Sequence, residues 1–132
     1  MVVDTMGNLL TVVVHAANVQ DYHGARQVFQ RLGARPWERL QKIWADAIYK
    51  GDTYLHDWVQ EQFGWELEVV EREPGVKGFQ VLPKRWVVER TFAWLGRNRR
   101  LSKDYELLPE TSETWIYIAM TNLMVRRLAL SQ

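Results

Sequence analysis

The sequence predicts an α/β fold in which helices flank a mixed sheet, with the elements in the order β-β-α-β-α-β-α-α. Three features of the sequence lead to this prediction. They are short runs of apolar or alternating residues, longer stretches with apolar residues at helical spacing, and the glycines and prolines between them. Strands interleaved with helices are typical of α/β domains. The chain has 132 residues, of which 47% are hydrophobic and 25% charged, so we expect one domain over residues 1–132.

The expected strands are short. Residues 9–14 read LLTVVV, and residues 1–4 are expected to pair with them as an antiparallel hairpin across a turn at 6–8. Residues 40–45 (LQKIWA) and 65–70 (WELEVV) are the other two candidates, and in the second Trp65, Leu67 and Val69 alternate with glutamates. Crossover helices are expected to join these later strands.

Four helices are expected. The first begins with Asp21 as N-cap, ends at Gly33, and carries an apolar stripe of Ala25, Val28, Phe29 and Leu32. The second covers residues 54–63 and ends at Gly64, and the third runs from about Pro83 to Gly96. The last starts at residues 109–112, where Thr111 or Ser112 is the expected cap, and its apolar residues continue to Leu128.

Composition excludes several classes of protein. The chain has no cysteine, which excludes a disulfide scaffold and a thiolate zinc site. Its three histidines, His15, His23 and His56, are too far apart in the sequence to suggest a zinc cluster. No stretch has the length of apolar residues that a membrane span needs, and the first residues lack the basic start of a signal peptide. We therefore expect a cytoplasmic protein without a membrane partner.

Positive charge is concentrated in one window. The net charge is only +1, but residues 84–103 contain seven basic side chains and a single acidic one. Such a cluster is typical of a surface that binds an anionic partner, most often nucleic acid. The alternative is a solvated helix face and loop. The predicted DNA-binding residues are Lys84, Arg85, Arg90, Arg97, Arg99, Arg100 and Lys103.

Two carboxylates are candidates for metal-dependent chemistry. Asp46 follows a predicted strand, at the edge where α/β sheets collect ligands, and Glu89 is the one acid in the basic window. Together they can hold a divalent metal that activates water or a 3′-hydroxyl against a phosphodiester. The alternatives are a turn or cap for Asp46 and an ion pair for Glu89. Such a site usually needs a third carboxylate, whereas Asp4, Asp21 and Asp104 are interpreted as turn or surface residues.

Residues 83–106 (PKRWVVERTFAWLGRNRRLSKDYE) resemble the carboxyl-terminal signature of DDE transposases from bacterial insertion sequences. Residues 3–7 (VDTMG), 15–21 (HAANVQD) and 43–46 (IWAD) agree with this resemblance. It implies an RNase H-like fold that binds two Mg²⁺ or Mn²⁺ ions through two aspartates and a glutamate, and that cuts and joins DNA at element ends.

By this resemblance, Asp46 matches the second aspartate of the family, Glu89 its glutamate, and Arg85 the arginine four residues earlier. The sequence departs from the signature Y-x2-R-x3-E-x6-K at Leu82 and Gly96, and DAIY replaces the preferred D-G-x-Y or D-x-G-Y after the second aspartate. The first aspartate belongs on a strand upstream of Met1. We therefore expect an incomplete RNase H-like fold, the truncated part of a transposase catalytic domain.

The expected function is that of a transposase-derived fragment that is inactive alone because it lacks the first catalytic aspartate. Mg²⁺ or Mn²⁺ is expected to bind weakly or not at all. The expected partners are DNA, further copies of the chain in a homo-oligomer, and a separate chain that supplies the missing amino-terminal strand. The alternatives are a non-catalytic DNA-binding or regulatory module and a self-associating relic.

Overall fold

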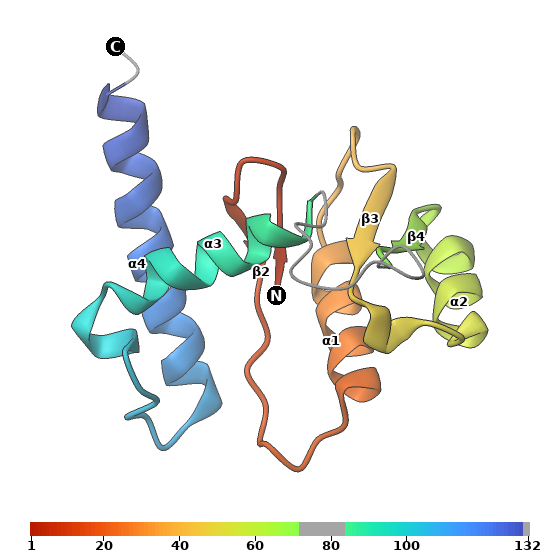
Figure 1. Ribbon diagram of the computed structural model, residues 1–132, viewed down its shortest axis with the longest axis horizontal. Helices are drawn as coiled ribbons and strands as arrows, with labels where there is room; N and C mark the ends of the chain where they lie inside the picture. Colours follow the sequence, from red (N-terminus) through yellow and green to blue (C-terminus); the bar gives the residue numbers. More distant parts are fainter. Residues whose placement is uncertain (72–83, 131–132) are drawn as a thin grey trace, which may run out of the picture.

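A computed structural model describes residues 1–71 and 84–130, except for the side chains of residues 21, 22 and 85. Its main elements confirm the predicted order β-β-α-β-α-β-α-α (Figure 1). They are β1 (Val2–Val3), β2 (Leu9–Thr11), α1 (Asp21–Gly33), β3 (Lys42–Ala45), α2 (Thr53–Phe63), β4 (Glu66–Val69), α3 (Arg85–Gly96) and α4 (Pro109–Leu130). Two short 3₁₀ helices, η1 (Ala47–Tyr49) and η2 (Arg99–Leu101), are additional.

The strands form two separate two-stranded sheets rather than one mixed sheet. Strands β1 and β2 make the predicted antiparallel hairpin, with Val3 opposite Leu9. Strands β3 and β4 are parallel and are joined through α2, as expected for a crossover connection. Within residues 1–71 and 84–130 no strand bridges the two pairs, so their backbone hydrogen bonds do not extend from one sheet to the other.

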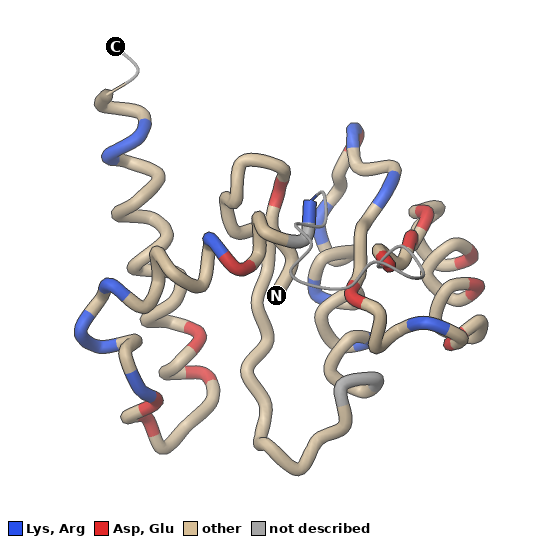
Figure 2. The backbone as a smooth tube through the Cα atoms, in the orientation of Figure 1, with Lys and Arg blue, Asp and Glu red and all other residues tan. Residues whose placement is uncertain are grey.

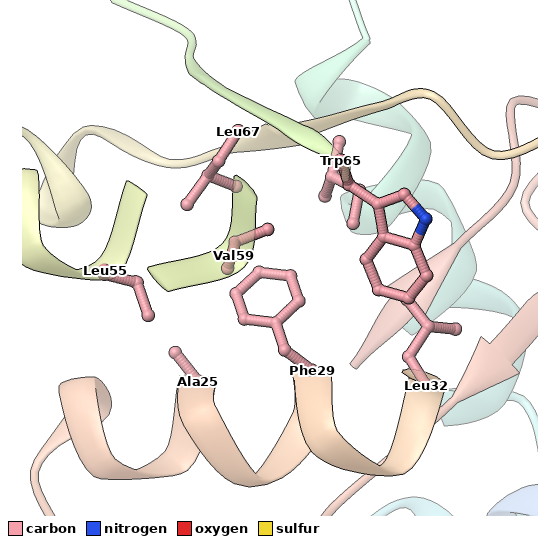
Figure 3. Close-up of a cluster of buried hydrophobic side chains, with 8 residues drawn as sticks. Ala25, Phe29, Leu32, Leu55, Val59, Trp65 and Leu67 are labelled. Carbon is pink, nitrogen blue, oxygen red and sulfur yellow. The ribbon is translucent and has the colours of Figure 1, made fainter. Parts of the chain in front are cut away.

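The main hydrophobic core lies between α1, α2 and the β3–β4 sheet (Figure 3). Helix α1 contributes its predicted stripe, and Trp65 and Leu67 are buried while Glu66 and Glu68 are exposed, which confirms the alternation predicted for β4. Burying each of these large side chains stabilises the fold by roughly 1.5–3 kcal/mol. The buried cluster consists of Ala25, Phe29, Leu32, Ile43, Leu55, Val59, Trp65 and Leu67.

An ion-pair ladder supports the β3–β4 sheet from its solvent side. Lys42 Nζ lies 2.8 Å from a Glu68 oxygen and 3.0 Å from a Glu66 oxygen on the neighbouring strand. These hydrogen bonds raise the pKa of Lys42, and the bond from Lys42 lowers the pKa of Glu68. Because all three side chains are solvated, these ion pairs add little stability.

The helix ends agree only in part with those predicted from the sequence. Gly64 ends α2 in the left-handed conformation, at φ 71°, as predicted. The prediction of Asp21 as N-cap of α1 is wrong, because Gln20 is the extended residue before the helix. Helix α4 begins at Pro109, so Thr111 and Ser112 lie inside it. The predicted start of the third helix at Pro83 falls outside the described residues.

Helices α3 and α4 pack on each other, and α3 also packs on the hairpin (Figure 1). Among the described helices, none is both long and apolar enough to cross a membrane.

Replacing Gly33 by alanine is expected to destabilise the fold by about 1–3 kcal/mol. A Cβ at Gly33 would overlap the Phe63 ring. That ring stacks on Trp65 at 4.8 Å and meets the edge of Trp58 at 5.4 Å, so it has little room to move. Urea unfolding of Gly33→Ala measures the loss. The control is Gly96→Ala in α3, where a Cβ meets nothing within 4 Å and stability should not fall. Equal stability of the two variants would contradict this prediction.

Candidate functional site

A cleft of about 470 Å³ lies where the two sheets and helices α1 and α3 meet. Apolar residues of the core form its base, among them Val28, Phe29 and Ile43. Polar and aromatic side chains from three different segments also line it. They are His15, which follows β2, then Trp44 in β3 and Asp46 directly after it. Lys84, the N-cap of α3, and Glu89 within α3 complete this set.

Asp46 lies at the carboxyl end of β3, where the sequence predicts it. The parallel pairing of β3 with β4 fixes the strand, and the chain turns into η1 directly after it. The Asp46 carboxylate is exposed, and its Oδ1 accepts a hydrogen bond of 2.6 Å from the backbone N–H of Ala47. Asp46 thus caps η1, as the alternative interpretation expects, and at the same time lines the cleft.

Glu89 lies on the second turn of α3 and lines the same cleft. Its position depends on how α3 is attached to the hairpin. The Thr91 hydroxyl is fully buried and lies 2.9 Å from the carbonyl oxygen of Val87 and 3.2 Å from that of Gly7. Gly7 has a φ of +81°, and a Cβ there would lie 2.8 Å from the Trp94 ring. Only glycine therefore permits this close approach of helix and turn.

Two arginines hold the hairpin turn against the carboxyl-terminal helices. Arg90 of α3 donates to the carbonyl oxygen of Met6 at 3.1 Å, and Arg127 of α4 donates to Asn8 Oδ1 at 2.7 Å. The Arg90 guanidinium also lies 4.2 Å from the centre of the Trp86 ring and 4.7 Å from that of Trp94. Arg90, a predicted DNA-binding residue, is thus engaged within the protein.

The other acids expected as turn or surface residues have local partners. The Asp4 carboxylate accepts hydrogen bonds from the backbone of Met6 and Asn8 and from the Asn8 side chain, at 2.8–2.9 Å. Asp104 accepts from the Ser112 hydroxyl at 2.9 Å. The side chain of Asp21 lies outside the described part of the structure.

The residues of the cleft offer an incomplete metal site. Carboxylate oxygens are the ligands that Mg²⁺ and Mn²⁺ prefer, and Asp46 and Glu89 bring two carboxylates to one cleft. Among the described residues, however, no group of three acidic, histidine or cysteine side chains is close enough together to hold a metal. The residues present therefore do not by themselves fit a two-metal centre.

The basic window extends from the N-cap of α3, through Arg90 within the helix, to the segment that follows it (Figure 2). Lys84 lines the cleft and places its Nζ 3.5 Å from the centre of the Trp44 ring. At the other end, beyond the 12 residues of α3 or about 18 Å, lies an exposed group of Arg97, Arg99, Arg100 and Lys103. Within this group, Arg100 pairs with Glu106 at 2.7 Å. The side chain of Arg85 is outside the described structure.

His15 and Trp44 also line the cleft, although neither is among the site residues predicted from the sequence. The His15 ring packs over Gly24, where a Cβ would overlap it, and its Nδ1 lies 3.1 Å from the carbonyl oxygen of Ala16. Both residues lie in the segments 15–21 and 43–46 that carry the family resemblance, which is the signal that points to them. The contact between Lys84 and Trp44 spans separate elements and has no such signal.

The family of transposase DDE domains matches residues 1–124 of the chain. This stretch contains both sheets, Asp46 and Glu89. No curated protein and no solved structure matches.

Replacing Thr91 by valine is expected to destabilise the fold by about 1–3 kcal/mol, because the buried carbonyl of Gly7 loses its hydroxyl partner. Thr91→Ser, which keeps the hydroxyl, is the matched control and should lose less. Urea unfolding compares the two variants. A Thr91→Val protein as stable as the parent would show that the hydroxyl does not hold α3 to the hairpin.

Proposed function

Since the chain belongs to the family of transposase DDE domains, we propose that it is the carboxyl-terminal part of an RNase H-like domain that cuts and joins the DNA of a bacterial insertion sequence. In this proposal Asp46 acts as the second aspartate and Glu89 as the glutamate of the acidic triad. The observation that carries the proposal is that these two residues, from different elements, line one cleft.

The third carboxylate comes from a strand outside residues 1–132, either in a separate chain or in a preceding segment. This strand lies between β1 and β3 and joins the two sheets. The hydrogen bonds of β3 support this position. Gln41 and Ala45 accept from β4 backbone groups at 2.8 and 2.9 Å, so the alternate residues Lys42 and Trp44 direct their backbone groups to the other edge. Trp44 lines the cleft.

Divalent ions, if held here together with a third carboxylate, would supply activation of an attacking hydroxyl and charge stabilisation at a phosphodiester. Asp46 and Glu89 are the residues of this chain that would hold them. The described residues that line the cleft include no third acid, so the chain alone is proposed to be inactive. Its own residues orient the site: the Ala47 amide fixes the Asp46 carboxylate, the contact of Thr91 with Gly7 fixes α3, and Lys84 places a positive charge at the cleft.

We predict that the 132-residue chain alone does not cleave DNA in Mg²⁺ or Mn²⁺, because one ligand of the metals is missing. Calorimetry should detect at most weak Mn²⁺ binding, and Asp46→Asn or Glu89→Gln should remove it. The matched control is Asp57→Asn, which changes an exposed carboxylate on α2.

Metal-dependent cleavage at element ends by this chain, lost in Asp46→Asn, would contradict the proposed incompleteness. Mn²⁺ binding that persists in both variants would contradict the assignment of the two carboxylates. DNA binding by a chain that shows no Mn²⁺ binding in calorimetry would favour the alternative of a non-catalytic DNA-binding module, which the exposed basic group beyond α3 supports.

We also propose weak, sequence-independent DNA binding through the basic window, with a dissociation constant on the order of 10⁻⁶–10⁻⁴ M that rises with salt. Reversing Arg97, Arg99 and Arg100 to glutamate should abolish it. Because Arg100 is already paired with Glu106, the double variant Arg97→Glu/Arg99→Glu should lower the salt slope by about 2.

The control for this measurement is Arg35→Glu/Arg39→Glu. It makes the same charge change at exposed residues between α1 and β3. Fluorescence anisotropy with labelled duplexes gives both affinities as a function of salt. Unchanged DNA binding in the triple variant would show that DNA contacts another part of the protein.

A further inference from the structure

A turn between η2 and α4 presents apolar side chains to solvent. Leu107 is 94% exposed, and its neighbours Tyr105 and Leu108 are 58% and 57% exposed. Residues 104–108 are called the Leu107 turn below. Single apolar residues are ordinary on a protein surface, but several large ones next to one another make a patch of the kind that contacts a partner.

The backbone that carries Leu107 is held on both sides. Arg100 binds the Glu106 carboxylate at 2.7 Å, and the same guanidinium lies 5.2 Å from the centre of the Trp115 ring on α4. After Leu107, the carbonyl oxygen of Leu108 accepts a hydrogen bond of 3.0 Å from the first turn of α4. The Leu107 side chain therefore projects from a fixed position, so little conformational entropy is lost when it enters a partner.

The acids of the Leu107 turn are bound within the protein, whereas the cations that precede it are exposed. The Asp104 carboxylate accepts a hydrogen bond of 2.9 Å from the Ser112 hydroxyl and one of 3.2 Å from the backbone N–H of Glu106. The Glu106 side chain, which Arg100 binds, is 12% exposed. Figure 2 shows the basic stretch that leads into the turn. Its exposed side chains outside the pair with Glu106 are Arg97, Arg99 and Lys103.

An apolar tip beside exposed cations is complementary to duplex DNA. The outside of the duplex carries phosphates, which lysine and arginine bind whatever the base sequence. The faces of the stacked base pairs are apolar, and several proteins that bend DNA insert a leucine or another apolar side chain between two of them from the minor groove. The cost of unstacking is offset by the apolar contact and by further contacts with the bent duplex.

We propose that Leu107 inserts between two base pairs of DNA held by Arg97, Arg99 and Lys103, and that it bends the duplex at that step. This inference rests on the proposed DNA binding and adds a site of distortion to it. Leu107 carries the insertion because its side chain is the most exposed of the patch and its backbone is fixed at both neighbours. Since a mismatched step costs less to unstack, the protein favours mismatched over fully paired DNA.

Fluorescence of the base analogue 2-aminopurine tests the insertion, because this base becomes brighter when it is unstacked. The 132-residue chain is titrated into a fully paired duplex and into one with a single thymine–thymine mismatch, each with the analogue at the same step. The parent should bind the mismatched duplex about tenfold more tightly and raise its fluorescence. Leu107→Ala should bind both duplexes equally, with an affinity close to that of the parent for the paired one, and should leave the fluorescence unchanged.

The matched control is Leu130→Ala, which should behave as the parent. Leu130 is 88% exposed and lies at the other end of α4, about 30 Å from the Leu107 turn. Leu107→Met, which keeps an apolar side chain, should retain the preference for the mismatch. All three variants should melt at the temperature of the parent because both leucines are exposed. Energy transfer between dyes at the two duplex ends gives the bend, which should be roughly 20–90° for the parent and absent in Leu107→Ala.

Three results would overturn the inference. They are a parent that binds DNA without unstacking or bending it, a Leu107→Ala variant that distorts DNA as the parent does, and a Leu130→Ala variant that loses the distortion equally. In each of these cases the chain still binds DNA, so the proposed DNA binding stands. A chain that binds neither duplex contradicts both proposals, and the measured affinities therefore separate the two kinds of failure.

Discussion

The contact between the buried Thr91 hydroxyl and the Gly7 carbonyl links the two parts of this protein on which the cleft depends. The hairpin turn has no side chain at Gly7, so α3 can approach it closely, and Arg90 and Arg127 then bind the carbonyl of Met6 and the side chain of Asn8. Because α3 is attached to the hairpin in this way, Glu89 lines the cleft. Asp46, which lines the same cleft, follows β3 of the other sheet. The candidate site thus depends on packing that lies outside it.

Among the described residues, Asp46 and Glu89 are the acids that line the cleft, whereas Asp4 and Asp104 bind elsewhere. The oxygens of Asp4 are occupied by backbone and side-chain donors of the turn, and Asp104 is bound by Ser112 near the start of α4. Both carboxylates are therefore used to shape local structure.

The positive charges of the basic window have different surroundings. Arg90 lies against two tryptophan rings and Lys84 over a third, where the flat faces of the rings attract the cations. Such contacts hold these side chains against the protein. Arg97, Arg99 and Lys103 are exposed beyond the end of α3.

The sequence by itself determined the order of the elements, the buried faces of α1 and β4, and the two carboxylates assigned by family resemblance. These features follow from periodicity and short motifs, which depend on residues close together in the chain. Only the tertiary structure showed that Asp46 and Glu89 share a cleft, that the strands form two sheets, and that Arg90 binds the hairpin turn 84 residues away. Contacts between residues so far apart in the sequence depend on how helices pack against turns, and a local sequence pattern does not predict that packing.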